Sequence, residues 1–316
     1  MDPMRITVLA GGPSAEREVS LVGGRAVADA LASLGHDVAL RDITPDNLSA
    51  LDRPGVDLVF PVLHGTWGED GRLQRILDDR GLPYVGSGPE ASALAMNKAE
   101  SKSAFVAAGL PTPAWQVWSG WPDGPVGWDG PWPVVVKPLE QGSSVDLFIP
   151  ADAEAMRQAV GAVCGRYQRC LVEQFIAGRE LTVGVLGAEA LPPIEIRVSA
   201  DHAYYDYHAK YVAEDTSYTA DPDLPDGCRA ALGERALAAH GVLGCRDYSR
   251  VDFLLDQRSE PLLLEVNTIP GFTSHSLLPM AARAIGLDFT SLCGRLVEIA
   301  WRRTARSADL RSRSGD

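Results

Sequence analysis

The chain has 316 residues, which is more than one hydrophobic core usually organises, so we expect two or three compact units. Hydrophobic residues make up 46% and charged residues 22%, a composition that excludes disorder over most of the length. A net charge of −13 argues against a nucleic-acid partner, because binding to phosphate backbones needs a basic face.

The sequence also bears on where the protein works. No apolar run approaches the roughly 18 residues that a membrane span needs, and the apolar stretch at the N-terminus is too short for a signal peptide. The five cysteines are scattered and include no CxxC pair, so they predict buried thiols rather than disulfides or a zinc site. We therefore expect a cytoplasmic protein with no membrane partner.

The first 95 residues predict a sheet of parallel strands. An apolar strand, a turn with two glycines and an amphipathic helix are followed by a second strand, a second helix and a short third strand. The two longer strands lie within residues 4–10 and 56–65, the second helix within 71–81 and the short strand at 83–86. Ligands bind at the carboxyl ends of such strands, where Gly11, Gly12, His64 and Gly65 lie.

The rest of the chain predicts mixed strands and helices. Residues 119–133 are dense in Gly, Pro and Trp, and we expect the tryptophans of this irregular loop to pack against their own domain rather than bind a ligand. The elements expected after it are a strand ending near Lys137, a helix near 151–164, a strand at 170–175, a helix at 226–243, strands at 248–256 and 261–267, and a last helix ending near Trp301. The polar, arginine-rich tail at 306–316 is expected to be mobile.

The sharpest local pattern is the segment PLEQGSS at 138–144. A glycine followed by two small hydroxyl residues lets backbone amides approach phosphate oxygens, and Lys137 can reach the same oxygens. Ordinary loop chemistry is the alternative. Lysine is otherwise scarce, being found only at Lys98, Lys102 and Lys210, and its compact ammonium group suits phosphate. A compositional bias that left four surface lysines would explain the same pattern.

Polar side chains also interrupt two apolar strands near the C-terminus. Arg250 and Asp252 alternate on one face of the first strand, and Glu265 and Asn267 on one face of the second. Two carboxylates and an amide oxygen on adjacent strands make the hard-oxygen site that Mg²⁺ prefers. The alternative is a structural salt bridge between Arg250 and one carboxylate. The cost of burying charge within apolar strands favours the metal site.

Eight segments occur in an order typical of one family. They are GGPSAEREVSL (11–21), HGTWGEDG (64–71), MNK (96–98), VVVKPLEQGSSV (134–145), VEQFIAGRELTV (172–183), YYDYHAKY (204–211), SRVDFLL (249–255) and LEVNTIPGFTSHSLLPMAA (264–282). Together they resemble the ATP-grasp fold, and specifically the D-alanine–D-alanine ligase family, across nearly the whole chain. The resemblance implies three domains of α/β and α+β type and a tail: an N-terminal parallel-sheet, Rossmann-like substrate domain (1–95), a central lid domain (96–180), a C-terminal catalytic domain (181–305) and the mobile tail (306–316).

The resemblance further implies an activity. The enzyme would join two D-alanines into D-alanyl-D-alanine through an acyl phosphate, for peptidoglycan precursors, using ATP and two Mg²⁺ ions (or Mn²⁺) as a homodimer. A ligase with another second substrate, either a D-hydroxy acid or a different D-amino acid, is one alternative, and a nucleotide-binding homologue without catalysis is another. A dinucleotide-dependent oxidoreductase is not supported, because Gly11-Gly12-Pro13 supplies no G-x-G-x-x-G motif.

Matched position by position, the resemblance also implies residue roles. ATP contacts fall on Lys98, Lys137, Glu173, Gln174, Phe175, Ile176, Glu180 and Lys210. Contacts to the two amino acids fall on Glu16, His64, Arg250, Gly271, Ser276 and Leu277, and metal contacts on Asp252, Glu265 and Asn267. The catalytic set is Glu16, Ser143, Tyr211, Arg250 and Gly271. For Glu16 the alternative is an acid in the first turn of a helix, and for residues 174–176 it is plain packing.

Two residues depart from the family pattern. Asp146 stands where the family has glycine, so we expect its carboxylate to repel ATP phosphates and its backbone to need a positive φ angle. His208 stands where the lid motif usually carries glutamate, which puts lid docking in question. Among the lysines, Lys102 has no implied ligand and is expected at the surface.

Overall fold

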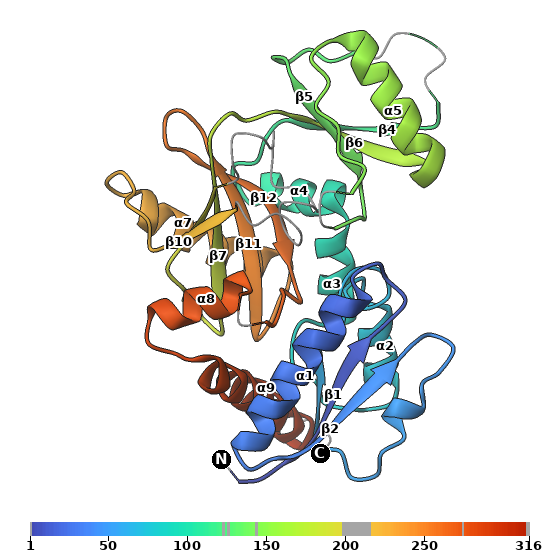
Figure 1. Ribbon diagram of the computed structural model, residues 1–316, viewed down its shortest axis with the longest axis vertical. Coiled ribbons are helices and arrows are strands. Elements are labelled where there is room, and N and C mark those ends of the chain that lie inside the picture. The colour runs from blue at the N-terminus through green and yellow to red at the C-terminus, as the bar shows by residue number, and fades with distance from the viewer. Residues whose placement is uncertain are drawn as a thin grey trace.

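The structure is a computed structural model that describes residues 2–121, 124, 127–142, 145–197, 216–273 and 275–313, with side chains as far as residue 306. Its described strands form three sheets, which follow one another along the long axis of the molecule (Figure 1). The N-terminal sheet lies at one end, the small central sheet at the other, and the C-terminal sheet between them.

The N-terminal sheet is parallel, as predicted, with β1 between β2 and β3. Its elements are β1 (Arg5–Gly11), α1 (Arg17–Ser33), β2 (Asp37–Ile43), the 3-10 turn η1 (Ser49–Leu51), β3 (Leu58–Pro61) and α2 (Arg72–Asp79). β1 is buried along most of its length because it is the central strand, which explains its continuous apolar run. A Cβ atom on Gly24 would lie 2.5 Å from Ala10 Cβ, so glycine lets α1 approach β1 closely.

The central sheet is antiparallel, with the order β4-β6-β5, and α5 packs against it (Figure 1). The elements are β4 (Trp115–Ser119), β5 (Val134–Pro138), α5 (Ala153–Tyr167) and β6 (Arg169–Gln174). Asp152 caps α5 by accepting a hydrogen bond of 2.9 Å from Ala155 N. Trp118 of β4 and Trp128 of the loop pack against the core between α5 and the sheet, so the predicted packing role holds for Trp128, whereas Trp121 and Trp132 are exposed.

The C-terminal sheet has the strand order β10-β9-β7-β11-β12, with β8 paired to β7. Its elements are β7 (Arg179–Leu186), β8 (Glu189–Ala190), β9 (Ile194–Arg197), β10 (Ser217–Ala220), α7 (Cys228–Val242), β11 (Tyr248–Leu255), β12 (Pro261–Asn267) and α8 (Leu277–Ala284). Alternate residues of β7, namely Leu181, Val183 and Val185, join a core with α7. The opposite face of the sheet packs against α8 and carries the polar residues of the candidate site.

Three further helices connect these sheets. α3 (Pro89–Met96) and α4 (Lys98–Ala107) run between the N-terminal and central sheets, and α4 buries Phe105 in the core of the C-terminal sheet. α9 (Phe289–Arg313) returns to the N-terminal domain and packs beside α1 (Figure 1). None of the helices in the described ranges combines the length and hydrophobicity that a membrane span requires.

The architecture confirms the predicted fold class, but some elements differ from the prediction. The last helix does not end near Trp301 and instead continues to Arg313, because the sequence after it is rich in the good helix formers Arg, Ala and Leu. The pattern did not reveal β2, α3, α4 or β4. β2 is half-exposed and carries charged residues, and α3 and α4 mix small residues without a clear apolar stripe. The domain borders implied by the resemblance stay a prediction.

A buried ion pair joins the N-terminal domain to the C-terminal sheet and α9. The Asp247 side chain, 1% exposed, accepts two hydrogen bonds of 2.8 Å from Arg303 and a third of 2.8 Å from Gly86 N. Arg303 also donates to the carbonyl of Tyr84 at 2.8 Å. Charge-assisted contacts therefore hold the N-terminal domain against the C-terminal sheet and α9.

We expect Asp247→Asn to lower the free energy of unfolding by about 3–5 kcal/mol, because Arg303 would lose its buried counter-charge. Asparagine tolerates the left-handed backbone at this position, where φ is 64°. Urea unfolding monitored by circular dichroism measures the loss. The matched control is Asp52→Asn, whose exposed pair with Arg80 should contribute less than about 1 kcal/mol. Equal losses in the two variants would contradict the assignment.

Candidate active site

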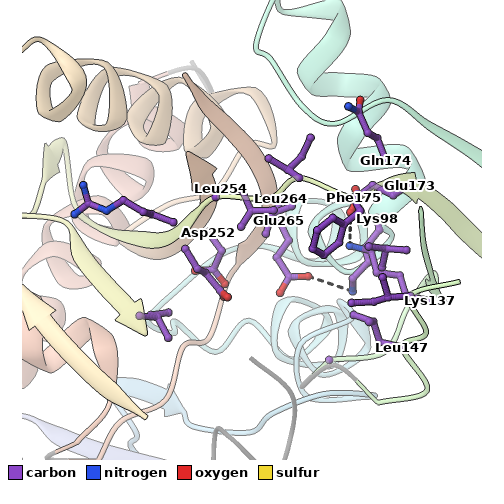
Figure 2. A pocket seen from close by; sticks show the side chains of 18 of the residues that line it. Lys98, Lys137, Leu147, Glu173, Gln174, Phe175, Asp252, Leu254, Leu264 and Glu265 are labelled. Carbon is purple, nitrogen blue, oxygen red and sulfur yellow. Dashed lines mark hydrogen bonds and ion pairs between the residues drawn. The ribbon is translucent and has the colours of Figure 1, made fainter. Parts of the chain in front are cut away.

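A cavity of about 500 Å³ lies between the central and C-terminal sheets (Figure 2). The apolar part of its wall comprises Val135, Leu147, Ile149, Phe175, Ile176, Ile196, Leu254 and Leu264. The charged part comprises Lys98, Lys137, Glu173, Arg179, Glu180, Glu195, Arg197, Asp252 and Glu265. The structure thus gathers nine residues predicted to contact ATP or metal in one cavity: Lys98, Lys137, Glu173, Gln174, Phe175, Ile176, Glu180, Asp252 and Glu265.

Two lysines reach this cavity from different elements. Lys98 starts α4, donates to the carbonyl of Gln141 at 2.8 Å, and lies 3.3 Å from the carboxylate of Glu265. Lys137 comes from β5 and pairs with Glu173 on β6 at 2.9 Å (Figure 2). The contact of Lys98 with Gln141 links α4 to the loop at 138–144, the segment predicted to bind phosphate.

The prediction that Lys102 is a surface residue is wrong. Its side chain is 0% exposed, and its ammonium nitrogen lies 2.5 Å from Glu173 Oε2. It lies one helical turn after Lys98 and so shares its face of α4. Burial opposes ionisation of Glu173, but the charges of Lys102 and Lys137 outweigh burial and lower the pKa of this carboxyl group. The scarcity of lysine in the sequence is a signal that could have drawn attention to Lys102.

Strand pairing places the predicted metal ligands together. Asp252 on β11 lies opposite Glu265 on β12, and Arg250 lies opposite Asn267, so the four side chains share one face as predicted. Arg250 donates two hydrogen bonds to Asp252, of 2.9 and 2.7 Å. The salt bridge considered as the alternative is therefore present. Thr182 on β7, which the sequence did not reveal, also donates to Asp252 at 2.6 Å.

This donor set suits a hard divalent cation. Mg²⁺ is commonly held by one or two carboxylates, while water and substrate phosphate complete its shell. Asn267 Oδ1 accepts a hydrogen bond of 3.1 Å from Ile269 N, which orients the amide. Within the described ranges, no group of three or more His, Cys, Asp or Glu residues is arranged to hold a metal. Two carboxylates and one amide are a donor set that suits a Mg²⁺ ion whose shell is completed by a phosphate.

A second polar cluster lies in the N-terminal domain. His64 is buried, and its Nδ1 lies 3.0 Å from the carbonyl of Ile269; because a carbonyl only accepts, Nδ1 carries the proton. Nε2 is then the acceptor and has no partner among the described residues. Burial lowers the pKa of His64, although the charge of Glu16 opposes this.

Burial, with the charge of Glu16, raises the pKa of Glu69 to about 8. The sequence did not single out Glu69, whose carboxylate accepts from Gly65 N at 2.5 Å.

The loop between β12 and α8 brings Gly271, Ser276 and Leu277 together. A Cβ atom on Gly271 would lie 2.7 Å from Ser276 Oγ, so a larger residue at this position would displace the Ser276 hydroxyl. Ser276 Oγ accepts a hydrogen bond of 3.0 Å from Thr273 N. Leu277 is the first residue of α8, in the turn whose N–H groups point out of the helix and favour an anion.

Three residues with roles implied by the resemblance, Ser143, Lys210 and Tyr211, lie outside the described residues, as does His208, which departs from the family pattern. Their roles stay predictions. Glu16 nevertheless lies close to the loop that carries Ser143, because a Cβ atom on Gly142 would be 3.8 Å from Glu16 Oε2.

Asp146 has the left-handed backbone expected at a glycine position, with φ of 53°. Its carboxylate accepts hydrogen bonds of 2.7 Å from Arg166 and from the hydroxyl of Tyr167. Both partners lie at the end of α5. The orientation therefore does not support the expected repulsion of phosphate, because this charge is already engaged on α5.

Comparisons with known proteins agree with this geometry. A family model described as the D-ala D-ala ligase C-terminus matches residues 126–298, and one described as the D-ala D-ala ligase N-terminus matches residues 46–87. A D-alanine–D-alanine ligase of Marinobacter nauticus is 47% identical over 295 residues, which cover 93% of this chain and 90% of that protein.

Solved structures show the same likeness. The D-alanine–D-alanine ligase of Bacillus anthracis complexed with ATP is 28% identical with a TM-score of 0.81, and the match covers 96% of this chain and 99% of that one. The VanG D-Ala:D-Ser ligase of Enterococcus faecalis is 27% identical with a TM-score of 0.81, and the match covers 95% and 100%. The fold and the cavity between two antiparallel sheets are those of the ATP-grasp class. Within that class, the chain belongs to the D-alanine–D-alanine ligase family.

The buried Glu69 predicts a dependence of stability on pH. The folded state keeps a proton on Glu69 that the unfolded chain releases above its ordinary pKa, so the free energy of unfolding falls as pH rises toward about 8. The Glu69 carboxyl group lowers the free energy of unfolding by at most about 1.4 kcal/mol for each unit by which the pH rises. Urea unfolding of wild type and Glu69→Gln between pH 5.5 and 8 should show a flatter profile for the variant. Glu90→Gln, at an exposed pair with Arg75, is the control and should follow wild type. Superimposable profiles for Glu69→Gln would show that Glu69 is ionised throughout.

Proposed function

We propose that the protein is an ADP-forming ligase that joins two D-alanines into D-alanyl-D-alanine for peptidoglycan precursors. The observation that carries the proposal is that apolar residues, two lysines and the carboxylates of Asp252 and Glu265 line one and the same cavity. Its relatives of 44–47% identity are named D-alanine–D-alanine ligase. Because the reaction consumes ATP, the proposal includes a cytoplasmic location. A homodimer, which the resemblance implies, is part of it.

The nucleotide would lie along the length of the cavity. Its adenine would lie in the apolar part between the sheets, near Phe175 and Ile176, and Glu180, which lines the same cavity, would accept from the ribose hydroxyls. The phosphates would meet Lys98 and Lys137, whose ammonium groups are compact donors. Lys210, outside the described residues, is proposed to contact the transferring phosphate.

The first chemical step would be attack of the carboxylate of one D-alanine on the γ-phosphate of ATP, which gives an acyl phosphate and ADP. Glu16 and the unprotonated Nε2 of His64 are acceptors suited to the ammonium group of this substrate. Asp252, Glu265 and Asn267 would hold Mg²⁺ (two ions, with Mn²⁺ as a substitute), which when bound neutralises phosphate charge.

The second step would be attack of the amine of the other D-alanine on the activated carbonyl, followed by loss of phosphate. Arg250 and the backbone N–H of Gly271 are proposed to stabilise the tetrahedral intermediate. Ser276 and the N–H of Leu277 would bind the carboxylate of the second substrate, since a helix N-terminus favours an anion. Ser143 and Tyr211 are proposed to close the site with Glu16, because an acyl phosphate must be shielded from water.

A product assay tests the function directly. Purified protein is incubated with ATP, Mg²⁺ and D-alanine, then with D-serine, D-lactate or L-alanine in place of the second amino acid, and products are identified by mass spectrometry. D-Alanyl-D-alanine as the main product is expected. A mixed product in its place would identify a ligase for another second substrate, and ATP binding without any product would identify a non-catalytic homologue.

We expect Glu265→Gln to reduce the rate of phosphate release at least about 100-fold, because the proposed cation site would lose one of its two charges. Phosphate release with D-alanine and binding of Mn²⁺ by electron paramagnetic resonance are both measured. Glu260→Gln, at a half-exposed pair with Arg235, is the control and should keep its activity within about twofold. Retention of more than about a tenth of the wild-type rate by Glu265→Gln would reject the metal assignment.

A further inference from the structure

Lys102 lies where α4 meets the central and C-terminal sheets. Its side chain is completely buried, and its ammonium group contacts Glu173 and donates to Thr112 Oγ1, both at 2.5 Å. The Thr112 hydroxyl in turn donates to the carbonyl of Leu263 at 2.7 Å, so its oxygen accepts from the lysine. One hydrogen-bond acceptor, Thr112 Oγ1, and one ion-pair partner, Glu173, therefore hold a cation that is not among the residues lining the cavity.

Glu173 bridges this lysine to a second one. One carboxylate oxygen lies 2.5 Å from Lys102, and the other lies 2.9 Å from Lys137. The Glu173 side chain is 3% exposed, whereas Lys137 is 13% exposed and lines the cavity. With both lysines protonated, one carboxylate and two ammonium groups give this buried trio a net charge of +1. Burial lowers the pKa of the Lys102 ammonium group, and the charge of Glu173 opposes this. Burial disfavours an ionised Glu173, but the two lysines lower the pKa of its carboxyl group and keep it charged.

The net charge of the groups around Lys137 determines how strongly this lysine attracts a phosphate. If only Glu173 and Lys137 were present, they would form a closed pair with no net charge, which attracts phosphate weakly. Lys102 supplies the counter-charge that Glu173 needs. Because it binds the far oxygen, it also fixes the orientation in which the near oxygen meets Lys137.

We propose that Lys102 is a positioning residue for nucleotide binding: it neutralises and orients Glu173 and thereby leaves the charge of Lys137 available to the phosphates. This inference rests on the proposed function, because it takes the ligand of Lys137 to be the phosphates of ATP. No part of it requires Lys102 to contact the nucleotide.

The test is nucleotide binding measured by calorimetry on the full chain, with MgADP and adenosine as probes. Lys102→Met is expected to weaken MgADP about tenfold or more and to change adenosine binding less than about twofold, because adenosine carries no phosphate. The KM for ATP should rise while the KM for D-alanine stays within about twofold. Should Lys102→Met fail to fold, Lys102→Gln, which can still donate to Thr112, carries the same expectation.

A second variant separates charge from packing. Lys102→Met combined with Glu173→Gln removes the carboxylate that would otherwise neutralise Lys137, so MgADP affinity is expected to recover at least about threefold relative to Lys102→Met alone, although Glu173 is itself among the proposed ATP contacts. A purely structural role predicts no recovery. Thr112→Val, which removes an acceptor but no charge, is the control and should change MgADP affinity less than about threefold.

The outcomes are distinct. Failure of wild type to bind MgADP would overturn the proposed function. Wild-type binding with no change in Lys102→Met, or no recovery in the double variant, would overturn the role of Lys102 and leave the proposed function standing.

Discussion

A charge can be buried only when it is paired, and this constraint organises the cavity between the two antiparallel sheets. Lys102, Glu173 and Lys137 come from α4, β6 and β5, and Lys98 on α4 pairs with Glu265 on β12. Each pair joins elements that the chain does not make neighbours in sequence. The ion pairs therefore fix how the central sheet meets the C-terminal sheet, and they do so at the charged end of the cavity.

An irregularity in the C-terminal sheet completes the cavity. The pairing of β11 with β12 shifts register between Asp252 and Phe253, so one residue of β12 is left without a partner. Successive residues of a regular strand point to opposite faces, yet Leu264 and Glu265 both line the cavity. A β-bulge permits this arrangement, because it re-aims side chains locally. One short segment thus supplies an apolar contact and a carboxylate to the same space.

The sequence predicted the fold class, half of the described strands and the shared face of Asp252 and Glu265, because these depend on local period and on an ordered series of motifs. It did not place Lys102, since a lysine in a helix without an apolar stripe gives no local sign of burial. Glu69 was missed for a similar reason: its raised pKa depends on burial and on the approach of Glu16, which only the folded chain produces. The orientation of Asp146 likewise depends on Arg166 and Tyr167, about twenty residues away in sequence.

The C-terminal sheet meets the N-terminal domain at one joint and the central sheet at a second joint. The difference between these two joints bears on how the enzyme works. At the first joint, the carboxylate of Asp247 accepts three hydrogen bonds, from Arg303 and from Gly86 N, which hold the N-terminal domain against the C-terminal sheet. At the other end, the central sheet meets its neighbour where Glu173 is held between lysines. The first joint keeps His64 in contact with Ile269, beside the strands that carry the carboxylates. The second sets the position of Lys137. A ligand bound between the sheets would therefore act on the second joint, because that is the one whose charges line the cavity.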